Sequence, residues 1–355
     1  MTNMRRFKMG TVFGLVGLLA TILLSQETLA ADHQISPAHT LKVSPKLSNE
    51  KEAENISGAA CAVRDQKRSS CLLIGDEVKF ARFFTMDDDT LVPGDKLFLL
   101  PETYKDGKEI KEYDETDAEG IAYSKPKDPN DKSSRGFYYL VGSHGLNKSG
   151  ELQPSRYFIY RFSVEQATGQ AADLGSKDSP STQVERSANL QKIILGDPQL
   201  LEHEEDIPDK GGINIEGLAV AGDDLYIGFR GPLLDGQAVI ASLPVGDAFD
   251  NPKAKLKKYS VFLGEGQGVR DIAAVDGGFL VLSGPQRDTS GPSSLCFWRP
   301  GSDPDHCFDV VKAGPDDSKP EALAVVDTTP DHYEVLIMSD GPRNGAPAIY
   351  EIPRK

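Results

Sequence analysis

The sequence predicts an all-β protein, a β-propeller of five four-stranded blades. Three observations support this prediction. Segments rich in β-branched and aromatic residues, bounded by Gly, Pro, Asp and Ser, dominate the chain, whereas long segments of helical period are absent. The same order of four strand-type segments also recurs at intervals of roughly 50 residues. With 355 residues, the chain is long enough to bury a substantial core.

The first thirty residues have the pattern of a secretory signal peptide. Basic residues precede the uncharged run 10–25, and small residues then lead to Ala30 at the spacing that a signal peptidase requires. The run is short for a membrane span, and a retained N-terminal anchor is the alternative interpretation. We therefore predict a signal peptide over 1–30, an N-terminal segment over 31–54 and a propeller domain over 55–355. The mature protein is then exported, to the periplasm or to the cell exterior.

The acidic composition excludes two classes of partner. The formal charge at pH 7 is −15, and it becomes −17 when Arg5, Arg6, Lys8 and Glu27 leave with the signal peptide. A surface of this charge repels phosphate backbones and anionic lipids. We expect no nucleic acid and no membrane surface as a partner, and we expect the processed chain to be a monomer without a membrane span.

The repeated feature is a glutamate–glycine step at the start of an apolar strand. Aligning the steps places five residues in register, and these are Gly58, Gly120, Gly217, Asp271 and Ala322. Their separations are 62, 97, 54 and 51 residues. Four-stranded units of about this length are typical of propeller blades.

Four strand-type segments follow each of the first four steps, and three follow the last. Unit one has segments 56–63, 70–77, 78–85 and 96–103. Unit two has 118–125, 136–144, 156–163 and 188–196. Unit three has 215–222, 224–231, 238–245 and 257–264. Unit four has 269–276, 277–284, 293–300 and 306–313, and unit five has 320–327, 333–340 and 347–353.

The last unit lacks the fourth strand that a closed ring requires. The segment "HTLKVSPKL" at 39–47 lies near the predicted mature N-terminus and could supply it. We predict that this segment closes the ring. Six blades are the alternative if the long second unit contains another sheet, and an open array of β-sandwiches is the alternative to a ring.

The four cysteines form two close pairs, Cys61 with Cys71 and Cys296 with Cys307, and each pair brackets a turn. If each turn is a hairpin, the partners face each other across antiparallel strands. No Cys-x-x-Cys motif and no zinc-type spacing of histidines is present. We predict two local disulfides, each contributing roughly 2–3 kcal/mol in an oxidising compartment. Four buried, reduced thiols are the alternative.

In a propeller, the starts of the inner strands and the ends of the second strands meet at one mouth of the central channel. The inner-strand starts hold Ser57, Glu119, Glu216, Arg270 and Glu321. The second-strand ends hold Asp76, Glu77, Ser143, His144, Arg230, Ser283 and Asp340. The glycine of the step allows the inner strands to approach closely at the axis. A carboxylate there costs free energy unless it is paired, hydrated or bound to a cation.

This arrangement predicts a metal site at the channel mouth. The candidate metal ligands are Glu119, Glu216, Glu321 and Asp340. Their charge of −4 and the +2 of Arg230 and Arg270 leave −2, which suits one divalent cation. Hard oxygen ligands favour Ca²⁺ as the cofactor. A structural network of salt bridges around a wet channel is the alternative.

Six stretches resemble a known bacterial family. They are "AEGIAY" at 118–123, "YYLVGSHG" at 138–145, "SRYFIYRF" at 155–162, "NIEGLAV" at 214–220, "LYIGFRGPLLDGQAVI" at 225–240 and "VRDIAAVDGGFLVLSGP" at 269–285. Together they look like the family known as domain of unknown function 3616, from about Ile56 to Pro353. The resemblance implies a propeller-like β fold and transfers no catalytic residues. The "EGIA" step alone is similar to exported esterase-like phytase propellers.

Two classes of function fit this pattern. In one, the protein is a binding or scaffold propeller that takes a small-molecule or polymeric ligand at the channel mouth. In the other, it is a Ca²⁺-dependent hydrolase, which the phytase-like resemblance directs at phosphoesters. Arg230 and Arg270 would then hold the anion, and His144 would move a proton. No Gly-x-Ser-x-Gly or His-Glu-x-x-His motif is present. The sequence favours binding and leaves open whether the protein is an enzyme.

Overall fold

The structure is a computed structural model that describes residues 34–47, 50–62, 70–87, 89–128, 130–131 and 133–354. The chain divides after Gln34, and Ile35–Lys355 is the second of its two units. The predicted signal peptide, 1–30, lies outside the described residues. Within the described part of the chain, no helix is long and apolar enough to cross a membrane.

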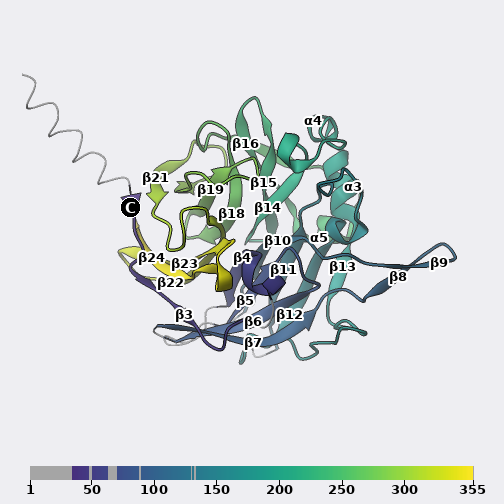
Figure 1. Ribbon diagram of the computed structural model, residues 1–355, viewed down its shortest axis with the longest axis horizontal. Coiled ribbons are helices and arrows are strands. Elements are labelled where there is room, and N and C mark those ends of the chain that lie inside the picture. Colours follow the sequence, from purple (N-terminus) through teal and green to yellow (C-terminus); the bar gives the residue numbers. More distant parts are fainter. Residues whose placement is uncertain are drawn as a thin grey trace, which may run out of the picture. The chain divides into compact units, whose positions relative to one another are not determined.

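Five antiparallel sheets of the second unit, the blades, surround a common centre (Figure 1). Their innermost strands are β4 (Ile56–Ala62), β10 (Ala118–Ser124), β14 (Asn214–Ala221), β18 (Gln267–Val275) and β22 (Lys319–Thr328). Each inner strand contacts the next one along the chain, and β22 contacts β4. The ring is therefore closed, and the predicted five-bladed propeller is confirmed.

The remaining strands extend each blade outward from the centre. Blade one continues with β5 (Ser70–Gly75), β6 (Phe80–Asp87) and β7 (Thr90–Phe98), and blade two with β11 (Gly136–Gly142), β12 (Ile159–Val164) and β13 (Glu185–Ser187). Blade three continues with β15 (Asp224–Leu234), β16 (Gln237–Pro244) and β17 (Lys257–Val261), and blade four with β19 (Gly278–Pro285), β20 (Ser294–Trp298) and β21 (Asp305–Val310). Blade five continues with β23 (His332–Asp340) and β24 (Ala348–Pro353).

The N-terminal strap, which we define as residues 35–47, crosses the outer edges of three blades. Its strand β2 (His39–Thr40) pairs with β24 and supplies the missing fourth strand of blade five, as predicted. Ile35, the last residue of β1 (Gln34–Ile35), accepts a 2.9 Å hydrogen bond from the backbone of Val311, directly after β21. Strand β3 (Lys42–Val43) pairs in parallel with β7 of blade one. The closure predicted for blade five thus extends to both of its neighbours.

The predicted outer strand of blade two, 188–196, is wrong, because this segment contains the helix α3 (Asn189–Leu195). Leu190, Ile193 and Ile194 are buried, and their i, i+3, i+4 spacing places them on one helical face. The blade ends instead in the short strand β13, which the loop 165–184 separates from β12.

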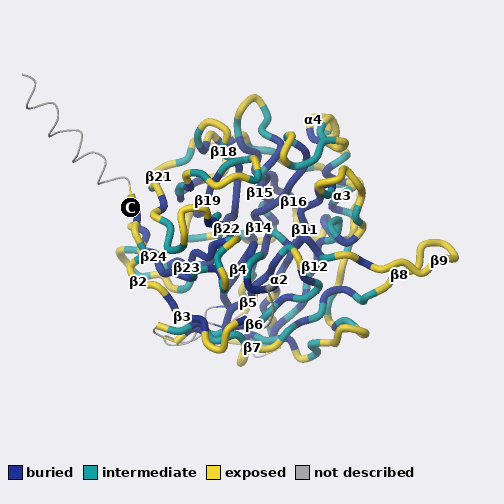
Figure 2. The backbone as a smooth tube through the Cα atoms, in the orientation of Figure 1, coloured by how far each residue is buried: buried dark blue, intermediate teal, exposed yellow. Residues whose placement is uncertain are grey.

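The other described helices are short and lie in connections. They are α2 (Glu50–Glu54), α4 (Pro198–Leu201), α5 (Val245–Asp250) and the 3₁₀ turns η1 (Pro154–Tyr157), η2 (Pro208–Lys210) and η3 (Arg343–Gly345). A separate hairpin of β8 (Thr103–Asp106) and β9 (Glu109–Glu112) projects from the ring and is exposed over most of its length (Figure 2).

The core lies between the blades. Each pair of adjacent blades shares one apolar cluster of buried side chains, and the ring thus has five such layers in its described part. Close approach of the inner strands makes these layers possible. A Cβ on Gly120 would lie 2.9 Å from the Cβ of Leu218, and one on Gly217 would lie 3.0 Å from Ile272. The step glycines therefore pack inner strand against inner strand, as the sequence predicts.

Blade four has Asp271 where the other blades have a small residue. Its carboxylate is fully buried and accepts backbone hydrogen bonds from Ile272, at 2.8 Å, and from Leu323 of blade five, at 2.7 Å. Burial raises the pKa of this carboxyl well above its usual value, against the effect of the backbone donors. Asp271 thus joins the inner strands of two blades through its side chain.

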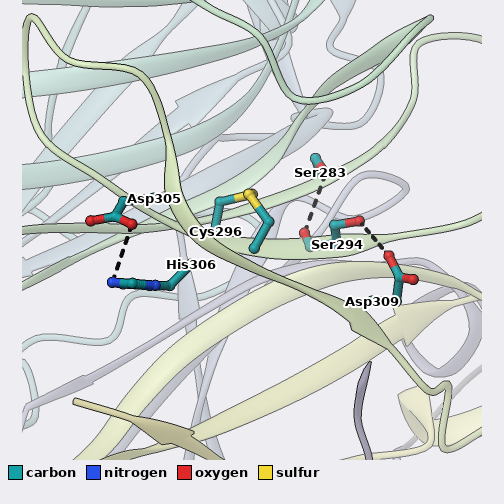
Figure 3. The surroundings of a disulfide bond; sticks show 7 residues. Ser283, Ser294, Cys296, Asp305, His306 and Asp309 are labelled. Atoms are coloured by element: carbon teal, nitrogen blue, oxygen red, sulfur yellow. Dashed lines mark hydrogen bonds and ion pairs between the residues drawn. A yellow bond between two sulfur atoms is a disulfide. The ribbon is translucent and has the colours of Figure 1, made fainter. Parts of the chain in front are cut away.

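Both predicted disulfides are present. Cys61 and Cys71 are directly opposite residues of β4 and β5, with Cα atoms 4.0 Å apart. Cys296 of β20 is bonded to Cys307 of β21, also with a Cα separation of 4.0 Å (Figure 3). Each bond closes a hairpin within one blade, which agrees with the pairing expected from the turn between the cysteines.

Candidate functional site

The candidate site lies where the inner strands begin, and a β-bulge positions its first five side chains. The register of every inner strand shifts by one residue at the step, and the bulged residues are Ser57, Glu119, Glu216, Arg270 and Glu321. A bulge turns one side chain out of the normal alternation of a strand. The step glycine can therefore face the next blade while the bulged residue is directed elsewhere.

Three of the bulged side chains meet in a buried ion-pair network. Arg270 is 1% exposed, and its Nη1 lies 3.2 Å from Oε2 of Glu216 and 2.5 Å from Oε1 of Glu321. Its Nη2 donates a 2.7 Å hydrogen bond to the carbonyl of Pro285. Contacts between residues of blades three, four and five show that these side chains converge across the channel.

Arg230 is the second arginine of this ion-pair network. Its Nη1 lies 2.7 Å from Oε1 of Glu216, which also accepts a 3.0 Å hydrogen bond from Asn214. Burial disfavours the charged guanidinium, but Glu216, Glu321 and other carboxylates outweigh burial and raise its pKa. Arg230 therefore stays charged, and its buried Nε has no hydrogen-bond partner among the described residues.

Lys319 neutralises the carboxylate of Asp340. The Lys319 Nζ lies 3.1 Å from Asp340 Oδ2 and also contacts Asp288. The hydrogen bond from Lys319 is the main reason why the pKa of Asp288 falls to about 2. Three of the four predicted metal ligands, Glu216, Glu321 and Asp340, are thus already paired with cationic side chains.

A second group of carboxylates comes from blades one and two, and we call Asp76, Asp117 and Glu119 the acid cluster. One carboxylate oxygen from each lies within 4.8 Å of the others. Asp76 directly follows β5, Asp117 directly precedes β10, and Glu119 is the bulged residue of β10. Of the four predicted ligands, only Glu119 belongs to this group.

Burial raises the pKa of all three carboxyls of the acid cluster. For Asp76 the pKa rises to about 8, first through burial and then through the charges of Asp117 and Asp340. Glu119 is raised well above its usual value by burial and by the neighbouring Asp117 and Glu216. The pKa of Asp117 also rises through burial, although Arg156 opposes the rise. Three carboxylates that resist ionisation together need protons or a cation.

Arg156 is the cationic side chain beside the acid cluster. Its Nη1 lies 3.0 Å from Asp117 Oδ2, and its Nη2 donates a 2.7 Å hydrogen bond to Glu115. Because Glu115 shares this guanidinium, one arginine does not balance three carboxylates. Sequence reasoning missed Asp117 as a ligand, because it stands two residues before the repeated step. Its left-handed backbone, with φ of 47°, is a signal that the sequence does not show.

His144 and Ser143 follow β11 in blade two. A hydrogen bond from Ser143 opposes the rise in the pKa of Asp117, whereas His144 is buried, with Nδ1 2.8 Å from Gln191 Oε1 of α3. Burial lowers the pKa of His144 to about 4. Its ring lies edge-on to Tyr157. The histidine is therefore neutral at pH 7, and its side chain contacts Gln191 of α3 and Tyr157 of η1.

The channel changes character away from the carboxylates. Further along the same inner strands lies a cavity of about 80 Å³, lined mostly by small and apolar residues of all five blades, such as Ala60, Ala122, Ala219, Ala273 and Ala324. The charged groups are thus confined to the end of the ring where the inner strands begin.

Comparison with solved structures gives distant likenesses. A family 117 glycoside hydrolase from the marine bacterium Zobellia galactanivorans is 12% identical, with 90% of each chain covered and a TM-score of 0.47. An unknown-function protein from Dyadobacter fermentans is 10% identical over 90% of this chain and 99% of its own, with a TM-score of 0.45. An exo-β-1,3-galactanase from Phanerochaete chrysosporium is 9% identical over 90% of this chain and 64% of its own, also with a TM-score of 0.45.

Comparison with curated proteins gives no match. The likeness of the "EGIA" step to phytase propellers stays a prediction from four residues. The match to a protein family is broader, since it covers residues 55–346, and thus nearly the whole ring. The chain belongs to the family described as protein of unknown function (DUF3616).

Proposed function

We propose that the protein binds an oxygen-rich ligand at the mouth of its channel, with one Ca²⁺ held by the acid cluster. The convergence of Asp76, Asp117 and Glu119 is the observation that supports this function most directly. Carboxylate oxygens are the preferred ligands of Ca²⁺, which takes six to eight oxygens at 2.3–2.6 Å. Three protein carboxylates leave positions that water or oxygens of a ligand can fill.

The charge around the acid cluster supports a divalent cation. Three ionised carboxylates contribute −3, and Arg156 contributes +1 but is shared with Glu115. A cation of charge +2 therefore balances the group, and it offsets the burial and the neighbouring negative charges that raise the pKa values of Asp76 and Glu119. This set differs from the predicted ligands, because Glu216, Glu321 and Asp340 already have cationic partners.

Arg230 and Arg156 can donate hydrogen bonds to acceptor atoms of a ligand at the channel mouth. Each has a buried Nε that lacks a hydrogen-bond partner among the described residues. Arg230 also interacts electrostatically with Glu119 and with Asp117, two members of the acid cluster. A small molecule or a polymer with hydroxyl or carboxylate oxygens could meet both the cation and these donors. The phosphoester hydrolase has no such support, because the His144 side chain contacts Gln191 and Tyr157 rather than a carboxylate of the acid cluster.

We expect the purified protein to bind one Ca²⁺ in calorimetric titration, and to lose this binding by at least tenfold in Asp76→Asn/Glu119→Gln. The binding should strengthen from pH 7 to pH 9. The reason is that the pKa of Asp76 is about 8, and Ca²⁺ must displace the proton that this carboxyl holds at lower pH. At a Ca²⁺ concentration of about 100 times Kd, the native state should gain about 2.7 kcal/mol.

The control is Glu112→Gln, which removes an exposed carboxylate of the projecting β8–β9 hairpin. Its Ca²⁺ affinity should stay within twofold of the unmodified protein. The cation site is refuted if Ca²⁺ at pH 9 produces no heat of binding and no shift of the thermal midpoint. The carboxylates would then form a protonated, structural cluster. Titration of acidic and neutral oligosaccharides with and without Ca²⁺ tests the ligand class.

We propose further that this site works outside the cytoplasm. Two disulfides are consistent with an oxidising compartment, and the pattern of residues 1–30 predicts a cleaved signal peptide. Mass spectrometry of the protein from its native envelope should give an N-terminus near Ala31. An intact chain with residues 1–30 in the cytoplasm would contradict export.

A further inference from the structure

A second group of potential metal ligands lies on β23 and β24 of blade five, away from the bulged residues of the channel mouth. Strand β23 begins with His332 and carries Glu334 two residues later, and Glu351 is on β24. One ligand atom from each residue lies within 4.8 Å of the others. The Nε2 of His332 is 3.8 Å from Oε1 of Glu334. Two zinc ligands at bonds of about 2.1 Å lie roughly 3.4 Å apart, so the group needs little adjustment to hold this metal.

The hydrogen bonds of Thr329 fix which nitrogen of His332 is free. The Thr329 hydroxyl donates to the carbonyl of His332 at 2.9 Å and accepts from the His332 backbone N–H at 3.0 Å. Its oxygen is also 3.1 Å from Nδ1 of the ring. When the hydroxyl proton is used on the carbonyl, Nδ1 donates to Thr329. The neutral ring then carries its lone pair on Nε2.

This lone pair lacks a donor. The Nε2 atom is buried and has no hydrogen-bond partner among the described residues, and Oε1 of Glu334 lies 3.8 Å from it. A lone pair facing a carboxylate is unfavourable unless a proton or a metal cation lies between them. A histidine whose Nδ1–H is held by an oxygen and whose Nε2 is free has the orientation of a metal-ligating imidazole.

The two glutamates add an independent argument. Glu334 and Glu351 are directly opposite each other in the register of β23 and β24. Like charges at opposite positions of antiparallel strands destabilise the pair. Neither carboxylate has a lysine or arginine partner in the described part of the chain. A metal ion shared with His332 would turn this repulsion into a link between the two strands.

We propose that His332, Glu334 and Glu351 bind Zn²⁺. One imidazole nitrogen and two carboxylate oxygens are ligands that zinc accepts, and three protein ligands leave one position for water or another group. The site is distinct from the acid cluster, which offers oxygen ligands alone. Glu351 is exposed, and His332 and Glu334 are half-buried, so the metal can reach the site from solvent.

Calorimetric titration of the chelator-treated protein with Zn²⁺ tests this site. We expect one Zn²⁺ with a Kd in the micromolar range or below, and a rise in the thermal midpoint. His332→Gln and Glu351→Gln should each weaken binding at least tenfold, and Thr329→Val about tenfold by freeing the ring. With Co²⁺ in place of zinc, the visible absorption of a four-coordinate site should appear and should be absent in His332→Gln.

Two controls separate this site from others. Glu112→Gln removes a glutamate on the exposed β9 strand, and Asp76→Asn/Glu119→Gln removes the acid cluster; both should bind Zn²⁺ as the unmodified protein does. Thermal unfolding without metal shows whether each variant is folded. The proposal would be overturned if the protein bound Zn²⁺ only with a Kd above about 100 times the expected micromolar value, or not at all. So would unchanged affinity in folded His332→Gln and Glu351→Gln proteins.

Discussion

A chain that lacks the N-terminal strap, residues 35–47, is expected to lose cooperative unfolding and to aggregate. The strap buries four apolar side chains, Ile35, Leu41, Val43 and Leu47, each no more than 8% exposed. At about 1.5–3 kcal/mol each, their burial contributes roughly 6–12 kcal/mol before entropy is counted. This is comparable to the whole stability of a typical domain, about 5–15 kcal/mol.

Deletion also exposes strand edges that the strap now covers. The backbone N–H of Ala38 donates to Ile349 of β24 at 2.8 Å, and that of Ser44 donates to Leu91 of β7 at 3.0 Å. Unpaired edges of this kind are templates for pairing with another chain. Light scattering and thermal unfolding of the shortened protein measure both consequences. A soluble protein with an unchanged thermal midpoint would contradict the closure.

Substitutions within the strap give a graded version of the same test. Leu41→Ala/Val43→Ala keeps the backbone pairing and removes two buried side chains, and we expect a loss of about 3–5 kcal/mol. Lys42→Ala is the matched control, because Lys42 lies between them with an exposed side chain. Its effect should stay within about 0.5 kcal/mol. A loss below about 0.5 kcal/mol in Leu41→Ala/Val43→Ala would show that the backbone pairing of the strap, rather than its buried side chains, holds the ring.

Arg270→Met is expected to destabilise the protein by about 3–5 kcal/mol at pH 8. The guanidinium is 2% exposed and contacts both Glu216 and Glu321, so its removal leaves buried carboxylates without their counterion. Glu216 keeps Arg230 and Asn214, whereas Glu321 loses its closest cation. Denaturant unfolding with both disulfides intact measures the loss.

The loss should be smaller at pH 5 than at pH 8. Burial already raises the pKa of Glu321, and Arg270 is the main group that opposes this rise. Without Arg270, the native state holds a proton on Glu321 to higher pH than the unfolded chain does. Stability then falls as pH rises above the unfolded pKa of glutamate, about 4.3.

Two variants sharpen this test. Arg270→Met/Glu321→Gln removes the unpaired charge, and it should recover at least half of the loss. Arg299→Met removes an exposed arginine whose Nη1 is 3.9 Å from Asp305, and it should cost less than about 1 kcal/mol. A loss below 1 kcal/mol for Arg270→Met would show that the network contributes little to the fold.

Most of the fold could be predicted because strand composition and repeat order are local features of the sequence. The repeated glutamate–glycine step, with segments rich in β-branched and aromatic residues, identified the inner strands of all five blades, and the shortfall in the last unit indicated that 39–47 closes the ring. The predicted outer strand of blade two was wrong because the prediction used only local sequence. Its segment, 188–196, is apolar enough for a strand, but Leu190, Ile193 and Ile194 also have helical spacing, and packing of that face selects the helix.

The repeat predicted which positions gather at the channel mouth, and it could not predict how they pair. Glu119 and Glu216 occupy equivalent bulges, yet Glu216 meets two arginines while Glu119 meets Asp76 and Asp117. This difference depends on which blade is the neighbour across the axis, and the spacing within one repeat contains no such information. Asp117 could not be identified, since a turn with positive φ, rather than the repeat, directs it.

By itself, the sequence determined a five-bladed ring, its two hairpin disulfides, its N-terminal closure and the five residues at the inner-strand starts. These features follow from strand period, cysteine spacing and repeat order, which act over tens of residues. Only the tertiary structure decided the ion pairs of Arg270, the acid cluster and the group around His332. These contacts join residues that are distant in the sequence, such as Arg270 and Glu216, which are 54 positions apart. Their geometry exists only after the ring of blades has closed. Burial then changes the charge that each carboxyl can hold, because the free energy of ionisation depends on the surroundings that folding creates.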